Sequence, residues 1–421
     1  MYHKTVLNNG LRILSERRDN YRSVSLGIWV NAGSRDEIGD EIGISHFIEH
    51  MLFKGTETRS SLDIAKELDA VGGFSNAFTG KEYTCFHAKV LDKHLPLLAD
   101  ILSDILLNSV FDPLDMDRER QVILQEISMV EDTPDDLIHV LFNDLFWKNH
   151  PLGRSVLGSN KTVSGIGKDH IIQYMKRYYR PERIVVTATG NIDHEELVAL
   201  FRPVFESLES GEQGYARNPP DIHAGVSCVQ KDLEQVHVCL GGQAPELGSE
   251  YRFAGALLNT ILGGNMSSRL FQEIREKRGL AYAVFSFLSP YIDAGLLGIY
   301  IATDTSSVNQ ALGLIRKEVE EVRKGGISLS DLEAAREHLI GGILLGAENT
   351  DSRMMRMAKN EHVFGRYISY EELVADLEKV TVDEVVAVAR DTFNTDCMSL
   401  MTLGPVKEEN LDLSCLQFSV D

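Results

Sequence analysis

The sequence predicts a chain of two α+β domains of similar size, and three observations support this fold class. Segments in which apolar and polar residues alternate, as in β-strands, are separated by segments with helical periodicity; the longest are residues 23–30, 82–90 and 297–303. A polar stretch that contains Gly and Pro and has no apolar period lies near the middle of the chain, at residues 207–220. The two halves on either side of this stretch also show a weak similarity to each other.

The polar stretch divides the chain into halves of ordinary domain size. We therefore predict a first domain at residues 1–206, an interdomain linker at residues 207–225 and a second domain at residues 226–421. With 43% hydrophobic and 25% charged residues, the chain has the composition of a globular protein that can bury two cores.

The most informative motif is His-x-x-Glu-His at residues 46–50. The apolar residues around it recur at helical spacing, so we expect a helix here. On a helix, His46 and His50 lie one turn apart on the same face, where both imidazoles can bind one Zn²⁺. Glu49 lies beside them and can take a proton from a metal-bound water. The alternative is a partly buried helix with two surface histidines.

A catalytic zinc site needs a third protein ligand and leaves the fourth position to water. Residues 115–130 are expected to form a helix with an apolar stripe. Within it, Glu119 and Glu126 are seven residues apart, so they project on nearly the same face. One could bind the metal while the other stands behind it and orients a ligand. The alternative is two solvated glutamates, which is the usual state of a Glu.

Taken together, these residues resemble the pitrilysin-type zinc metallopeptidases, the inverzincins of peptidase family M16, in their processing peptidase-like branch. That family pairs the motif with a Glu at the distance that separates Glu126 from His50, which is 76 residues. The resemblance implies that His46, His50 and Glu126 bind one Zn²⁺ per chain, which Co²⁺ or Mn²⁺ could replace. It also implies that Glu49 is the general base and that Glu119 is a supporting carboxylate.

The resemblance further implies two homologous α/β sandwich domains that face each other across a substrate chamber. Residues 72–79 resemble the family's edge strand beside the metal, on which Asn76, Ala77 and Phe78 would line an extended substrate peptide. Without the resemblance, the same residues would be interpreted as a Gly-Gly turn followed by a plain strand.

Two more residues would reach the site from the second domain. Arg275 and Tyr282 are seven residues apart, which is the family's spacing for an Arg and a Tyr that complete the site. A Tyr hydroxyl can donate to an oxyanion, and an Arg can hold a carbonyl or carboxylate of the substrate. By themselves they would be interpreted as a surface Arg and a packed Tyr.

The second half retains the pattern of the first half but none of its ligands. Two registers, with offsets of 209 and 216 residues, relate the halves. In these registers, the residues opposite His46, Glu49, His50, Glu119 and Glu126 are, in that order, Gly255, Leu258, Asn259, Ala335 and Gly342. We therefore expect one metal site, in the first domain, and a second domain that covers the substrate.

Charge and composition argue against several other classes of function. The net charge of −21 argues against binding to nucleic acid, and no apolar run approaches the length that spans a membrane. The five cysteines are scattered and form no metal motif, and the first residues lack the apolar core of a signal peptide. We therefore expect the protein in the bacterial cytoplasm, where thiols stay reduced.

Acidic residues that follow the ligand helix predict a preference among substrates. Processing peptidases use acidic residues in this region to bind an Arg near the cleavage point, and Asp136 matches one such position. Four residues later this chain has Val140 instead of a second acid, which departs from the family pattern. Cleavage near basic residues is the expectation, and a solvated acidic loop is the alternative.

We therefore predict a zinc-dependent metalloendopeptidase that hydrolyses peptides or presequence-like unfolded segments. The expected partners are a peptide substrate and a second copy of the chain, because relatives of this length tend to form dimers. One alternative is a non-catalytic scaffold or partner subunit of a processing-peptidase-like complex, and another is a metal-binding protein without peptidase activity. The complete ligand set together with Glu49 favours the enzyme.

Overall fold

A computed structural model describes residues 1–211 and 216–418 of the chain. Residues 212–215 of the expected linker and residues 419–421 of the expected second domain lie outside the described residues. The chain forms two compact units, each built from three segments. The first unit comprises Met1–Met129, Arg154–Arg217 and Leu345–Tyr367, and the second comprises Val130–Gly153, Asn218–Leu344 and Ile368–Asp421.

Each unit contains one segment from the other half of the chain. The expected domains at residues 1–206 and 226–421 are contiguous and do not contain such exchanged segments. Residues 130–153 precede the expected linker in the sequence, yet they belong to the second unit. Residues 345–367 follow it, yet they belong to the first unit. Each unit therefore contains most of one expected domain and one helical segment from the other half of the chain.

The first unit is built on a six-stranded sheet with the strand order β1-β2-β6-β3-β5-β4. The strands are β1 (Tyr2–Val6), β2 (Arg12–Arg17), β3 (Ser23–Val30), β4 (Phe74–Thr79), β5 (Thr84–Leu91) and β6 (Ile184–Gly190). Strands β2 and β6 are parallel, and the other neighbours are antiparallel. Strand β4 has β5 as its one neighbour in the sheet, so its other edge is open to pairing.

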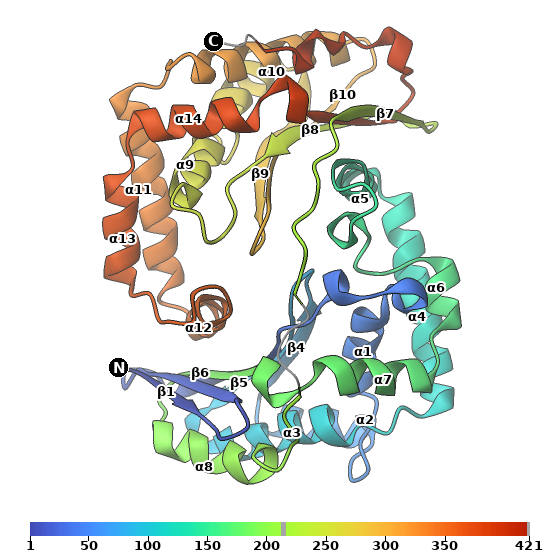
Figure 1. The fold of residues 1–421 in the computed structure, drawn as a ribbon, viewed down its shortest axis with the longest axis vertical. Helices are drawn as coiled ribbons and strands as arrows, with labels where there is room; N and C mark the ends of the chain where they lie inside the picture. Colours follow the sequence, from blue (N-terminus) through green and yellow to red (C-terminus); the bar gives the residue numbers. More distant parts are fainter. Residues whose placement is uncertain (212–215, 419–421) are drawn as a thin grey trace. The chain divides into compact units, whose positions relative to one another are not determined.

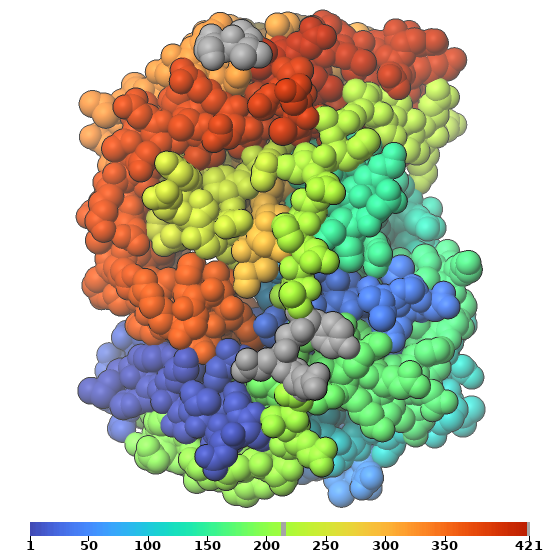
Figure 2. Space-filling view, viewed as in Figure 1, coloured from blue at the N-terminus to red at the C-terminus, as the bar shows by residue number. Residues whose placement is uncertain are grey.

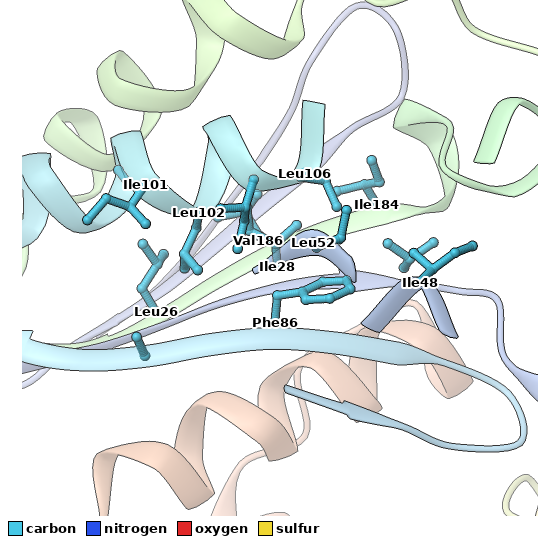
Figure 3. Close-up of a cluster of buried hydrophobic side chains, with 14 of the residues drawn as sticks. Leu26, Ile28, Ile48, Leu52, Phe86, Ile101, Leu102, Leu106, Ile184 and Val186 are labelled. Atoms are coloured by element: carbon cyan, nitrogen blue, oxygen red, sulfur yellow. The ribbon is translucent and has the colours of Figure 1, made fainter. Parts of the chain in front are cut away.

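The main core of the first unit lies between this sheet and helices on one of its faces (Figure 1). These helices and their neighbours are α1 (Ile44–Leu52), α2 (Ser61–Ala70), α3 (Leu95–Asn108), α4 (Pro113–Asp132), α6 (Asn160–Gly165), α7 (Lys168–Tyr178) and α8 (His194–Phe205). Figure 3 shows Leu102 of α3 above the sheet residues Leu26 and Phe86, with Ile48 of α1 in the same cluster. All four side chains are fully buried, so the core that holds the sheet also fixes α1.

The exchanged helix α12 (Thr350–Phe364) covers the opposite face of the same sheet. Figure 2 shows its orange atoms directly against the blue atoms of the N-terminal strands. Met354 is fully buried in a cluster with Trp29, and Arg353 forms a buried ion pair with Glu16 at 2.5 Å. The sheet is therefore covered on both faces, which explains why every residue of β6 is buried.

The second unit repeats this plan around a five-stranded sheet with the order β7-β11-β8-β10-β9. Its strands are β7 (Gly225–Gln230), β8 (Val236–Gln243), β9 (Ala281–Pro290), β10 (Gly295–Thr303) and β11 (Ser399–Gly404). Its helices are α9 (Arg252–Leu262), the π-helix η6 (Phe271–Glu276), α10 (Val308–Arg323), α11 (Leu329–Gly346), α13 (Tyr370–Lys379) and α14 (Val382–Thr392). The exchanged helix α5 (Pro134–Phe146) contacts β8 and β11 and buries Phe142 and Phe146 there. Helices and sheets in both units confirm the predicted α+β class.

Two further observations concern membranes and cysteines. No helix within residues 1–211 and 216–418 is both long enough and apolar enough to cross a membrane. All five cysteines are free. Burial raises the pKa of the Cys85 and Cys239 thiols well above the usual value, so neither is an activated nucleophile.

Candidate metal centre

Helix α1 carries the His-x-x-Glu-His motif and is held by its apolar face. The buried apolar residues of this helix are Ile44, Phe47, Ile48, Met51 and Leu52. Because they occupy one side, His46, Glu49 and His50 lie on the partly exposed side. The helix starts after Gly43, whose φ of +95° favours glycine. The Glu37 carboxylate accepts hydrogen bonds from two backbone N–H groups at this start, at 2.7 and 2.9 Å.

Glu126 of α4 completes a group of three possible metal ligands with His46 and His50. Its Oε2 atom lies 3.6 Å from Nε2 of His46 and 3.7 Å from Nε2 of His50. Donor atoms in a tetrahedral zinc site lie about 3.4 Å apart, because each bond to the metal is about 2.1 Å long. Two imidazoles and a carboxylate at these separations therefore fit Zn²⁺ with small side-chain shifts. Among the described residues, this is the one group of His, Cys, Asp or Glu side chains that could hold a metal ion.

The protonation of the group also suits metal binding. Burial, and then the neighbouring His50, lower the pKa of His46 to about 4. At neutral pH the His46 imidazole is therefore uncharged and has a lone pair for a metal. The side chain of Glu126 is 34% exposed, so solvent reaches the ligand group from this side.

A second carboxylate stands behind His50. Oε2 of Glu119 lies 3.1 Å from Nδ1 of His50, and Oε1 of Glu119 lies 2.7 Å from Nζ of Lys54. A carboxylate at Nδ1 favours the tautomer that is protonated there, which leaves the Nε2 lone pair directed at the metal. Lys54 balances the charge of Glu119 and holds one of its oxygens, so the three side chains form one polar chain that ends at a ligand.

Glu49 is held by the end of the edge strand. Its Oε2 atom accepts a hydrogen bond of 2.5 Å from the Thr79 hydroxyl. Burial raises the pKa of Glu49, and the nearby charge of Glu126 adds to this effect, while Thr79 and His50 oppose it. A carboxylate whose pKa is moved toward neutrality beside two potential metal ligands has the properties of a general base.

The predicted substrate residues lie on β4, at the open edge of the first sheet. Asn76 is exposed, and its side-chain oxygen accepts a hydrogen bond from the backbone of Ala77. Phe78 is partly buried and packs edge-on against Trp29, with ring centroids 5.6 Å apart. The strand is therefore anchored through Phe78, while its free edge can accept the backbone of an extended peptide.

Arg275 and Tyr282 belong to the second unit. Arg275 lies in the π-helix η6, and Tyr282 is the second residue of β9. The Arg275 guanidinium lies 5.0 Å from the centroid of the Tyr282 ring, within the range of a cation–π contact. Tyr282 is 80% exposed, so its hydroxyl is accessible to another molecule. The pair is therefore preorganised within its own unit, and its role toward the metal group stays a prediction.

Comparisons with known proteins identify the family. The model described as Insulinase (Peptidase family M16) matches residues 12–160, and the model described as Peptidase M16 inactive domain matches residues 165–339. The Uncharacterized zinc protease YmxG of Bacillus subtilis is 39% identical over 396 residues, which cover 94% of this chain and 97% of that protein. This chain belongs to peptidase family M16.

A further relative and two solved structures agree with this assignment. The Uncharacterized zinc protease SCO5738 of Streptomyces coelicolor is 42% identical over 416 residues, covering 96% of this chain and 90% of that protein. A protease from Helicobacter pylori has a similar fold, with a TM-score of 0.90 and 22% identity, over 96% of this chain and 99% of that one. A peptidase M16 inactive domain from Pseudomonas fluorescens has a similar fold, with a TM-score of 0.89 and 20% identity, over 96% of this chain and 98% of that one. The predicted M16 fold with two related domains is thereby confirmed.

The model described as an inactive domain matches residues 165–339 of this M16 chain, which include four of the five strands of the second sheet. Positions 255 and 259, which correspond to the two histidines on α1, lie on α9. Positions 335 and 342, which correspond to the two glutamates on α4, lie on α11. The described part of the second unit contains no group that could hold a metal.

Two residues that contact the candidate site, Lys54 and Thr79, were not predicted from the sequence. Lys54 lies four residues after His50, so helical spacing extended by one turn would have placed it near Glu119. Thr79 ends the segment in which Asn76, Ala77 and Phe78 were expected, and no local pattern indicates that its hydroxyl points at Glu49. The roles of all these residues stay predictions, although the structure brings His46, His50 and Glu126 together.

The Glu119→Gln variant is expected to bind Zn²⁺ about tenfold or more weakly than the wild type, because the amide removes the charge that favours the metal-binding tautomer of His50. Competition with a fluorescent zinc chelator would measure this change. Asp117→Asn is the matched control, because Asp117 lies on the same helix with a side chain that is 76% exposed. Equal zinc affinity in Glu119→Gln and in the wild type would contradict the supporting role.

Proposed function

We propose that this M16 chain is a zinc-dependent metalloendopeptidase that hydrolyses peptides or presequence-like unfolded segments. The observation that supports the proposal most strongly is the group His46, His50 and Glu126, whose donor atoms lie within 4.8 Å of one another. Glu49 lies on the same helix as the two histidines and is a carboxylate of raised pKa that is free to act as a base. A purely structural zinc site is usually closed by four protein ligands and needs no such base.

In this proposal His46, His50 and Glu126 hold one Zn²⁺ per chain, and Co²⁺ or Mn²⁺ could replace it. The bound metal would lower the pKa of water and polarise the scissile carbonyl. Glu49 takes the proton at Oε1, the oxygen that Thr79 leaves free, while the water oxygen attacks the carbonyl carbon. Glu49 then returns this proton to the departing amide nitrogen as the C–N bond breaks, so the base is restored.

The substrate would bind as an additional strand beside β4, where Asn76, Ala77 and Phe78 line the open edge. Main-chain pairing of this kind requires an extended peptide, which favours unfolded segments over folded proteins. Arg275 would hold a carbonyl or carboxylate of the substrate, and the hydroxyl of Tyr282 would donate to the oxyanion.

Charge supports a preference for basic peptides. The chain has a net charge of −21, which raises the local concentration of cationic substrates. Asp135 is the second residue of helix α5, and its side chain is 70% exposed, although its Oδ1 atom lies 3.3 Å from Nδ1 of His237. We propose cleavage near basic residues on this ground. The expected homodimer also stays a prediction, because the structure contains one chain.

A library of quenched fluorescent peptides, incubated with the zinc-loaded protein, tests the function. We expect cleavage at internal bonds, loss of cleavage after treatment with a chelator, and recovery after zinc is added back. Pairs of peptides that differ by Arg or Glu near the cleaved bond test the basic preference. Zinc binding without cleavage would indicate a metal-binding protein without peptidase activity. The absence of both zinc binding and cleavage would indicate a scaffold or partner subunit.

A further inference from the structure

We propose that Thr79 is a positioning residue that fixes the carboxylate of Glu49 and connects it to the edge strand β4. The inference rests on the proposed function, in which Glu49 is the base, and adds a residue that sets the geometry of that base. Thr79 would not touch the reacting atoms itself. It would act by holding one oxygen of Glu49, so that the other oxygen faces the attacking water.

The contact itself is short and specific. The Thr79 hydroxyl lies 2.5 Å from Oε2 of Glu49 and 3.4 Å from the backbone carbonyl of Ser45. A hydroxyl has one proton to donate, and the short contact to a charged acceptor is the stronger of the two. The Thr79 side chain therefore supplies a hydrogen-bond donor to the base.

This hydrogen bond restricts the side chain of Glu49, which would otherwise be flexible. A Glu has three rotatable bonds, and ordering it costs conformational entropy. A general base is effective only when it lies within hydrogen-bond distance of the proton it removes. With Oε2 held by Thr79, proton transfer is directed to Oε1. The expected consequence of losing the hydroxyl is a slower chemical step, with substrate binding little changed.

The position of Thr79 in the fold connects the base to the proposed substrate strand. Thr79 is the last residue of β4, and it pairs with Thr84 at the start of β5. The same short strand carries the open edge along which we propose that the peptide binds. A peptide paired with β4 and the carboxylate of Glu49 would therefore be positioned by one continuous piece of backbone. This arrangement sets the base relative to the peptide without a separate loop.

The Thr79→Val variant tests the proposal, because valine keeps the β-branched shape and removes only the hydroxyl. We expect kcat for peptide cleavage to fall about tenfold or more, with KM within about twofold of the wild-type value. Thr79→Ser restores a hydroxyl and is expected to recover most of kcat. The control is Thr84→Val, which makes the same change at the strand neighbour of Thr79, whose hydroxyl donates to the carbonyl of Ala32. Wild-type kcat in Thr79→Val, or equal losses in Thr79→Val and Thr79→Ser, would overturn the proposal.

A second measurement does not depend on activity and separates this inference from the proposed function. Urea unfolding of the metal-free protein is compared for Thr79→Val, Glu49→Leu and the double variant. If the hydroxyl serves Glu49, Thr79→Val lowers the unfolding midpoint when Glu49 is present and has a smaller effect in Glu49→Leu. Equal effects in both backgrounds would overturn the contact between the two side chains. If Thr79→Val has this smaller effect in Glu49→Leu but the wild-type protein cleaves no peptide, the contact between the two side chains stands and the proposed function is contradicted.

Discussion

Glu49→Gln is expected to reduce peptide cleavage by at least about 10²-fold while the protein still binds zinc. Glutamine has nearly the same shape as glutamate and can keep the hydrogen bond from Thr79, but it cannot take a proton from the attacking water. The metal ligands His46 and His50 are unchanged. Steady-state cleavage of a peptide found in the library, together with the zinc content per chain, would measure both parts of the result.

The matched control for this experiment is Glu57→Gln, which makes the same chemical change at an exposed position shortly after α1. We expect wild-type cleavage in this control. Cleavage at the wild-type rate in Glu49→Gln would exclude Glu49 as the base. Loss of zinc together with loss of cleavage would instead assign Glu49 a role in holding the metal group.

Glu126→Ala is expected to lower zinc affinity by more than about 100-fold, and with it all peptide cleavage, because the change removes one of three ligands. Supporting residues behind a ligand already change affinity by about 10- to 100-fold, so loss of a ligand itself exceeds that range. The remaining atoms, Nε2 of His46 and of His50, would leave the metal held by two imidazoles. Zinc affinity measured by chelator competition is the test, and cleavage in excess zinc reports any residual activity.

Asp117→Ala is the matched control for Glu126→Ala, because it removes a carboxylate from the exposed side of the same helix. We expect its zinc affinity and cleavage to equal those of the wild type. Unchanged zinc affinity in Glu126→Ala would mean that the third ligand lies elsewhere. Equal losses in both variants would mean that the net charge of α4, and not a specific ligand, attracts the metal.

The pair of histidines could be predicted from physical chemistry alone, because a spacing of four residues on an amphipathic helix brings them together. Helical spacing offered Glu119 and Glu126 as two candidates for the third ligand, but only the family resemblance, with its distance of 76 residues from His50, selected Glu126. Lys54 and Thr79 depend on where the chain goes after α1 ends and on which side of the helix β4 passes. Such contacts are decided by tertiary packing, which a local pattern does not contain.

In the fold, too, strands could be predicted from local patterns, whereas the helix that covers each sheet could not. The alternation of apolar and polar residues predicted strands at residues 23–30 and 297–303, and these coincide with β3 and with most of β10. The exchange of α5 and α12 between the units was not predicted, because an amphipathic helix does not specify which of two similar sheets it covers. The residues under α12 include an apolar cluster around Trp29, as in an ordinary core, beside buried polar contacts such as Arg353–Glu16.

The exchange of α12 has a consequence for synthesis of the chain on the ribosome. The sheet of the first unit is complete once β6 has emerged at Gly190, but the helix that covers its second face ends at Phe364. During translation of the intervening residues, the apolar face around Trp29 and Val185 has no cover from its native helix. The nascent protein would therefore need protection from aggregation over this interval, and a fragment that stops within residues 207–225 would expose the same face permanently.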